Sequence, residues 1–114
     1  MTYSGSFKNY QSGDDPSITR QGRFVYLEGV MTPTKTIEST NDGTLAFTVP
    51  EGFRPRRKAF TICQGSSSFR WLLLVDPDGS AYATRYSDGS YTSFGPSTYM
   101  PFSAVWTTEE EPPE

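Results

Sequence analysis

Few side chains in this sequence are suited to catalysis. The chain has no histidine, which excludes Ser-His-Asp and Cys-His nucleophilic machinery and removes the most common ligand of transition metals. Its single cysteine, Cys63, follows Ile62 on an apolar segment, so we expect a small buried core residue rather than a reactive thiol. One cysteine also cannot form an intrachain disulfide or a thiolate zinc site. No metal site and no cofactor are therefore expected.

Paired carboxylates are a catalytic arrangement that needs neither histidine nor cysteine, as in glycoside hydrolases. The acidic candidates are Glu28, Glu38, Glu51, Asp76, Asp78 and Asp88. Most of them fall in turn segments, where an aspartate accepts hydrogen bonds from its own backbone. Glu28 lies on an expected strand and is equally suited to a rim or an interface. We therefore expect that the protein is not an enzyme.

Aromatic side chains offer a binding surface instead. They make up 15% of the chain and are crowded between residues 69 and 99. Exposed Trp and Tyr near Arg present flat apolar faces and hydrogen-bonding tips, which suit the recognition of saccharides or proteins. The candidates for ligand binding are Trp71, Tyr82, Arg85 and Tyr86. The alternative, in which most of these rings pack between sheets or subunits, stays open.

The distribution of charge bears on possible partners. The formal net charge of −3 arises from the C-terminal tail, which holds Glu109, Glu110, Glu111 and Glu114. The rest of the chain is near neutral, so nucleic acid is not expected as a partner. No apolar run is long enough to span a membrane, so membrane insertion is not expected either. The basic run Arg54, Arg56, Arg57 and Lys58 is compatible with three roles: a solvated rim, a subunit contact or a phosphate site.

These candidates must be positioned by strands, because the sequence has no convincing helical periodicity. About eight short segments rich in β-branched and aromatic residues alternate with Asp-Gly turns, at 23–32, 34–38, 44–49, 58–64, 69–75, 80–86, 90–94 and 101–107. This pattern predicts an all-β fold, an antiparallel β-sandwich with a jelly-roll-like arrangement. We expect Leu45, Phe47 and Val49 on one face, a buried Ile62, and residues 90–94 paired back as a hairpin.

The segment 45–58 joins two strand-rich halves of the chain. Pro50, Gly52 and Pro55 exclude a helix or a central strand there, so we expect a rigid corner that takes no part in receptor binding. Residues 1–20 predict a flexible leader or an arm that docks on a neighbouring subunit. Residues 21–108 predict one β-sandwich head domain, and residues 109–114 predict a disordered acidic tail.

Two motifs resemble the C-terminal head domains of bacteriophage tail fibre and baseplate receptor-binding proteins. They are Val25-Tyr26-Leu27-Glu28-Gly29 and Val49-Pro50-Glu51-Gly52-Phe53-Arg54-Pro55, the second with Val49 where that family usually has leucine. The turn at Asp78-Gly79 and the residues after it are similar to a hairpin of the same family. There, Ala81 and Tyr82 stand where an aliphatic residue is usual. The resemblance covers roughly residues 20–107.

The resemblance implies a homotrimeric β-sandwich head of a phage structural protein. Such a head is made in the bacterial cytoplasm and carried on the virion tail beside other tail proteins. It would bind a saccharide or protein receptor on the bacterial surface during host adsorption, without enzymatic activity. Two alternatives remain. One is a purely structural virion module, such as a collar, spacer or decoration domain; the other is a carbohydrate-binding module attached to a cell-wall enzyme.

Overall fold

The computed structural model describes residues 2–38, 43–65, 69–87 and 93–112. These residues form eleven strands and no helix, and nine of the strands make two antiparallel sheets. The all-β fold predicted from the sequence is therefore confirmed, and the arrangement of the two sheets is that of a β-sandwich. No helix of the described residues is long and apolar enough to cross a membrane.

The first sheet has five strands in the order β1-β6-β9-β8-β7. Its strands are β1 (Thr2–Tyr3), β6 (Thr44–Thr48), β7 (Ala59–Gln64), β8 (Arg70–Val75) and β9 (Ser80–Ser87). A tight turn joins β8 to β9, in which the Gly79 amide donates to the Asp76 carbonyl and the Ser80 amide to the Asp78 carboxylate. The Asp78 carboxylate therefore serves the turn, as the sequence predicts, whereas Asp76 contributes its backbone carbonyl.

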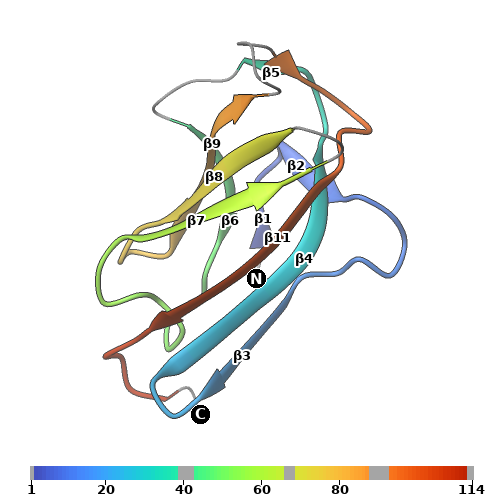
Figure 1. Ribbon diagram of the computed structural model, residues 1–114. Helices are drawn as coiled ribbons and strands as arrows, with labels where there is room; N and C mark the ends of the chain where they lie inside the picture. Colours follow the sequence, from blue (N-terminus) through green and yellow to red (C-terminus); the bar gives the residue numbers. More distant parts are fainter. Residues whose placement is uncertain (1, 39–42, 66–68, 88–92, 113–114) are drawn as a thin grey trace.

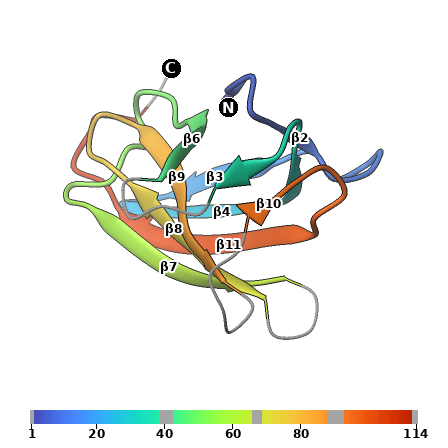
Figure 2. The same cartoon turned by 90° about the horizontal axis from the view of Figure 1, so that it is seen from above.

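The second sheet has four strands, and its central strand is the longest one that the structure describes. β4 (Phe24–Pro33) pairs with β11 (Met100–Thr107) along one edge and with β2 (Phe7–Asn9) and β3 (Ser17–Gln21) along the other. A separate small ribbon consists of β5 (Ile37–Glu38) and β10 (Ser93–Phe94). Figure 1 shows β7 beside β11, and Figure 2 shows the five-stranded sheet lying across the four-stranded one.

The core lies between the two sheets, because alternate residues of each strand point inward. Val25 and Leu27 of β4 are fully buried, as are Leu73 and Val75 of β8. The rings of Phe47 and Phe102 stack across the core with their centroids 5.3 Å apart. These contacts between residues distant in sequence hold the sandwich together.

The first twenty residues differ from the leader or subunit-docking arm expected from their polar composition. β1 pairs with β6 of the five-stranded sheet, while β2 and β3 pair with β4 of the four-stranded sheet. Phe7 is buried in the core, and Tyr3 and Ile18 pack against it. The folded unit therefore begins near residue 2 rather than at residue 21.

Two other expectations about strands are wrong in detail. β6 carries a bulge between Leu45 and Phe47, so Ala46 and Phe47 are both buried while Leu45 is 39% exposed. Ile62 lies on the outer face of β7, 78% exposed. Of the segment 90–94, expected to pair back as a hairpin, the described part is β10, which pairs with β5; residues 90–92 lie outside the described residues.

Cys63 is buried, as the sequence predicts. Burial raises the pKa of its thiol to about 11, although a backbone hydrogen bond at Ser103 opposes this shift. The thiol therefore stays protonated at neutral pH, which fits the core residue expected.

Candidate binding site

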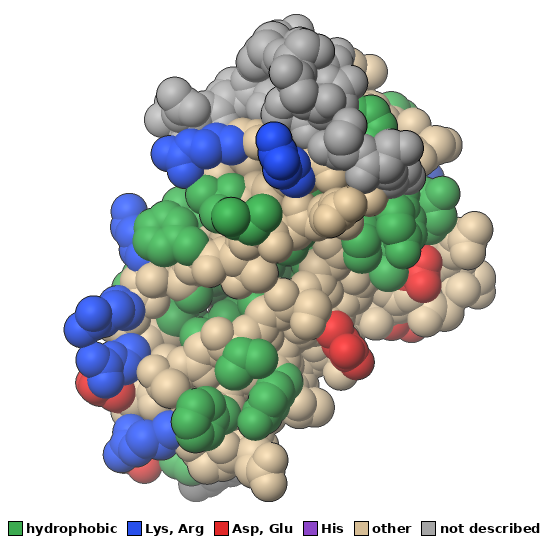
Figure 3. Space-filling view, in the orientation of Figure 1, with side chains coloured by type: hydrophobic (Ala, Val, Ile, Leu, Met, Phe, Trp, Pro, Cys, Tyr) green, Lys and Arg blue, Asp and Glu red, His purple; other side chains and the backbone are tan. Residues whose placement is uncertain are grey.

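A basic groove opens where the two sheets meet at their edges. β7 and β11 lie side by side and diverge toward the segment 53–58 (Figure 1). This groove has a volume of about 440 Å³ and is lined by residues 55–60 and 105–107. Figure 3 shows hydrophobic side chains on both sides of a hollow and Lys and Arg side chains along one margin.

The lining of the basic groove combines apolar walls with cations. Phe60 and Val105, 60% and 57% exposed, form apolar parts of the wall. Arg56, Arg57 and Lys58 are exposed beside them. This combination suits a ligand that carries both an apolar surface and negatively charged groups.

A second hollow adjoins the basic groove. It has a volume of about 580 Å³ and is lined by Arg23, Phe24 and residues 107–109 together with Arg56. Arg56 and Thr107 belong to both hollows, so the two form one continuous surface. Arg23 adds a further exposed cation and Phe24 a further aromatic ring, 52% exposed.

Charge at this surface is only partly neutralised within the chain. Arg56 Nη1 lies 3.7 Å from Glu109 Oε1, and Lys58 Nζ lies 4.0 Å from Asp76 Oδ1. Both pairs are long and both cations are exposed, so each pair stabilises the fold little and leaves its cation available to a ligand. The surface therefore favours carboxylate, sulfate or phosphate groups over neutral ones.

Hydrogen bonds fix the segment 53–58 against β11, and this fixes the shape of the groove. The Trp106 indole Nε1 donates to the Phe53 carbonyl at 2.7 Å, and the Arg56 amide donates to the Thr107 carbonyl at 3.0 Å. Pro55 restricts the backbone between these two bonds and is itself buried. Arg56, Arg57 and Lys58 thus extend from a loop whose backbone is held against β11.

The preceding corner, residues 49–54, is held by the C-terminal tail. The Glu110 carboxylate accepts hydrogen bonds from the amides of Gly52 and Arg54 at 2.9 and 3.0 Å. It also pairs with the Arg54 guanidinium, at 2.7 Å from Nε and 2.5 Å from Nη2. On the other side of the corner, Arg20 Nη1 donates to the Gly52 carbonyl at 2.6 Å. Hydrogen bonds from two sides thus hold the corner in place, as expected for a rigid connection.

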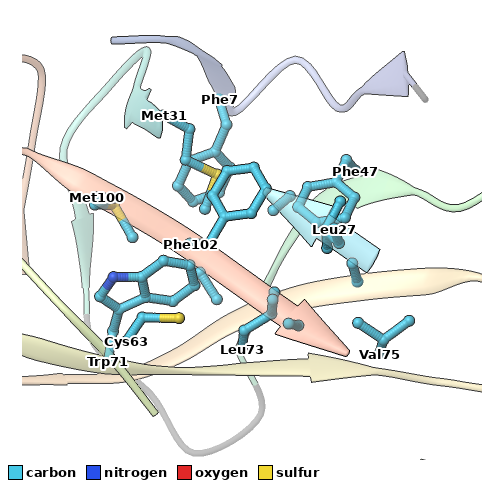
Figure 4. Close-up of a cluster of buried hydrophobic side chains, with 14 of the residues drawn as sticks. Phe7, Leu27, Met31, Phe47, Cys63, Trp71, Leu73, Val75, Met100 and Phe102 are labelled. Atoms are coloured by element: carbon cyan, nitrogen blue, oxygen red, sulfur yellow. The ribbon is translucent and has the colours of Figure 1, made fainter. Parts of the chain in front are cut away.

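Trp71, the first of the ligand-binding candidates, belongs to the core. It is 2% exposed and packs edge-to-face with Phe102, with ring centroids 6.5 Å apart. Figure 4 shows its indole beside Cys63, with Met100 across the core. Trp71 therefore cannot contact a ligand from the surface, and its assignment to a binding site is wrong for this fold.

The other three candidates lie on β9. Tyr82 is half-buried on the outer face of the five-stranded sheet, opposite Leu74 of β8 and Leu45 of β6. Arg85 is exposed and has a φ of 53° at an irregularity in the β8–β9 register, which breaks the alternation expected for 80–86. The side chain of Tyr86 and all of Asp88 lie outside the described residues. The structure does not bring Trp71, Tyr82 and Arg85 into one site.

The sequence predicts a corner at residues 45–58 that takes no part in receptor binding, and the basic groove now places candidate binding residues at its end, Arg56, Arg57 and Lys58. The signal available there is the run of three adjacent cations, Arg56-Arg57-Lys58, followed by the outward Phe60. The contribution of β11 is hidden, because this strand lies more than forty residues further along the chain. Within the described ranges, no three Cys, Asp or Glu side chains gather as a metal site would require.

Comparison of the sequence with known protein families and with curated proteins finds no match. The function of this chain is therefore inferred from its own residues and from the resemblance of its motifs.

Proposed function

We propose that this chain is the head domain of a bacteriophage tail protein and binds a bacterial surface receptor during host adsorption. The receptor is a saccharide or a protein, binding involves no enzymatic step, and the head works on the virion beside other tail proteins. The resemblance of residues 49–55 to such heads motivates the proposal, and it also implies a homotrimer. The basic groove is the observation that carries it.

The basic groove supports recognition in three ways. Its cations are exposed and weakly paired, so a ligand does not have to break strong ion pairs before binding. Its apolar walls, Phe60 and Val105, suit the CH faces of sugar rings or apolar protein side chains. Its open shape suits a chain-like ligand rather than a small enclosed substrate. Weak binding at one site would be strengthened by several copies on one virion.

The experiment measures adsorption of the purified full chain to a panel of bacterial cells and to polysaccharides extracted from them. The variant carries Arg56→Glu together with Arg57→Glu, which reverses the charge at the groove. We expect at least a tenfold loss of affinity, equivalent to about 1.4 kcal/mol. Adsorption that is absent from every wild-type sample, or unchanged in the double variant, would contradict the proposal.

Lys8→Glu provides the matched control. Lys8 is an exposed cation on β2, which pairs with the edge of β4 opposite to β11. Its charge is reversed in the same way, at one residue instead of two, outside the residues that line the groove. We expect its adsorption to stay within about twofold of the wild type, since a general electrostatic effect is small at physiological salt.

A purely structural virion module is the second candidate. The burial of Trp71 favours it, because an aromatic ring expected at a receptor site instead serves packing. Under this alternative the cations of the basic groove contact another tail protein. Binding of the chain to a purified tail protein, abolished by the same double variant, together with failure to adsorb to cells, would support the structural module over the receptor-binding head.

A further inference from the structure

The outer face of the four-stranded sheet presents three large side chains to solvent beside the basic groove. Phe24 and Tyr26 of β4 are 52% and 43% exposed, and Val105 of β11 is 57% exposed. Val105 stands directly opposite Tyr26 in the pairing of β4 with β11. Phe24 lies on the same face as Tyr26, two residues and about 7 Å away along the strand. We call these three side chains the outer platform.

The outer platform is continuous with the basic surface. Val105 is a wall of the basic groove, Phe24 lines the second hollow, and Arg56 belongs to both. The Thr108 amide donates to the Arg23 carbonyl at 2.9 Å, which holds the backbone of Arg23 beside this margin. Figure 3 shows hydrophobic side chains next to Lys and Arg side chains in the lower part of the molecule. A ligand that lies across the outer platform therefore meets cations at one margin.

Polar side chains border the outer platform away from the cations. Thr19 of β3 stands opposite Tyr26 and is exposed. Gln21 of the same strand stands opposite Phe24 and is also exposed. Hydroxyl and amide groups beside an exposed ring can hydrogen-bond the hydroxyls of a sugar whose CH face rests on that ring. The next row along β4 is polar as well, and its members are Ser17, Glu28 and Ser103.

The size of the outer platform favours a sugar ring over a protein partner. Half-exposed side chains of this kind present roughly 100 Å² each, or about 300 Å² for the three together. A specific contact between proteins buries about 800 Å² on each partner and has a larger apolar core. One sugar ring needs no more than a single aromatic face with hydrogen-bonding groups around it, which is the setting of Tyr26.

We propose that the outer platform and the basic groove together bind an anionic polysaccharide. One sugar ring stacks on Tyr26, and the carboxylate, sulfate or phosphate groups of the polysaccharide face the cations of the two hollows. The carboxylate of Glu28 keeps negative groups away from the other end of the platform. This inference rests on the proposed function, since it takes the basic groove as part of the receptor site, and it specifies the receptor as a charged saccharide.

Calorimetric titration of the purified full chain with polygalacturonate oligosaccharides tests the ligand class. This probe carries a carboxylate on every sugar ring. Its fully methyl-esterified form has the same rings without charge, and polyglutamate has the charge without rings. We expect polygalacturonate to bind at least about tenfold more tightly than either comparison ligand. Equal binding of polyglutamate would indicate recognition of charge alone or of an acidic peptide and would overturn the proposal. Equal binding of the ester, or no binding of polygalacturonate at millimolar concentration, would overturn it too.

Variants of Tyr26 test the stacking. Tyr26→Ala should weaken the binding of polygalacturonate at least about tenfold, whereas Tyr26→Phe keeps the ring and should stay within about threefold of the wild type. Tyr99→Ala is the matched control, because Tyr99 is also a partly exposed tyrosine, at 39%, and belongs neither to the outer platform nor to the lining of the two hollows. Its affinity should stay within about twofold of the wild type. Circular dichroism checks that each variant is folded.

The outcomes separate this inference from the proposed function. Adsorption to cells that is lost in the Arg56→Glu and Arg57→Glu double variant but unchanged in Tyr26→Ala would leave the receptor-binding head standing and overturn the stacking site. A chain that adsorbs to no cell, yet binds polygalacturonate through Tyr26, would refute host adsorption and support the saccharide site. Equal losses in Tyr26→Ala and Tyr99→Ala would overturn the assignment of Tyr26.

Discussion

Gly29 shows how a single missing side chain shapes the core. It lies on β4 in register with Phe102 of β11, and the pairing continues through it without a shift. A Cβ atom at this position would lie 2.6 Å from Cζ of Phe102 and 3.1 Å from Cα of Pro16. A glycine inside a strand marks either a bulge or a close approach, and at Gly29 the structure shows the close approach.

Gly29→Ala should lower the free energy of unfolding by about 1–3 kcal/mol, because the new methyl group must displace a confined ring. Phe102 cannot easily move away, since it stacks on Phe47 and contacts Trp71. Urea unfolding of the variant measures the effect. Gly5→Ala is the control, because nothing lies within 4 Å of its added Cβ, and its stability should stay within about 0.5 kcal/mol. Equal stability of both variants would contradict the packing described for Phe102.

At the scale of elements, the existence of the strands is read from the sequence more reliably than the faces they present. β4, β7, β8, β9 and β11 all occur where alternation and turn residues predict them. The face predicted for β7 is wrong, because alternation in Thr61-Ile62-Cys63 does not say which side is inward. In the folded chain the small Cys63 points toward β11 and the larger Ile62 points outward.

Local irregularities also escape prediction. The bulge at Leu45–Phe47 and the irregularity at Arg85 each shift the alternation by one residue. Such shifts depend on the partner strand, which a single segment does not reveal. The same limit hides the candidate site, since the basic groove needs β7 and β11 to lie side by side. The β-branched residues and Asp-Gly turns, by contrast, act locally and can be read directly.

The corner at residues 49–54 requires glycine at its centre. Gly52 is buried and has a φ of 95°, a conformation that a β-branched residue cannot adopt without strain. Gly52→Val should therefore destabilise the fold by about 2–3 kcal/mol and lower the melting temperature by roughly 10 °C. Thermal unfolding followed by circular dichroism measures this shift.

Glu51→Ala serves as the control for the corner, because Glu51 is the exposed neighbour of Gly52 in the same turn. It should change the melting temperature by no more than about 2 °C. If Gly52→Val melts at the wild-type temperature, the corner does not need the positive φ, and its rigidity has another origin.

At the scale of the whole molecule, Glu110 links the acidic C-terminal segment to the middle of the chain. Hydrogen bonds from the Arg54 side chain hold the pKa of Glu110 below its ordinary value of 4.5, and the amides of Arg54 and Gly52 add to this effect. The ionised carboxylate therefore stabilises the folded chain fully above about pH 4.5. This contribution is lost as the pH falls through the lowered pKa of the folded state.

Glu110→Gln should accordingly reduce stability at neutral pH and make stability fall less steeply in acid. Part of the pH dependence should remain, because hydrogen bonds from Ser80 also lower the pKa of Asp78. Urea midpoints measured from neutral to acidic pH give the comparison. Glu109→Gln, which removes the exposed carboxylate next to it, should track the wild-type curve. Coincident curves for Glu110→Gln and the wild type would show that the tail does not support the corner.

The pairing of the N-terminal segment with both sheets has a consequence for how the domain can be cut. β1 completes one sheet, and β2 and β3 complete the other. A chain trimmed to residues 21–108 would uncover unpaired N–H and C=O groups along β6 and along β4. Open edges of this kind recruit strands from other chains and lead to aggregation. The first twenty residues thus cover strand edges that would otherwise pair with other chains, and an expressed domain should retain them.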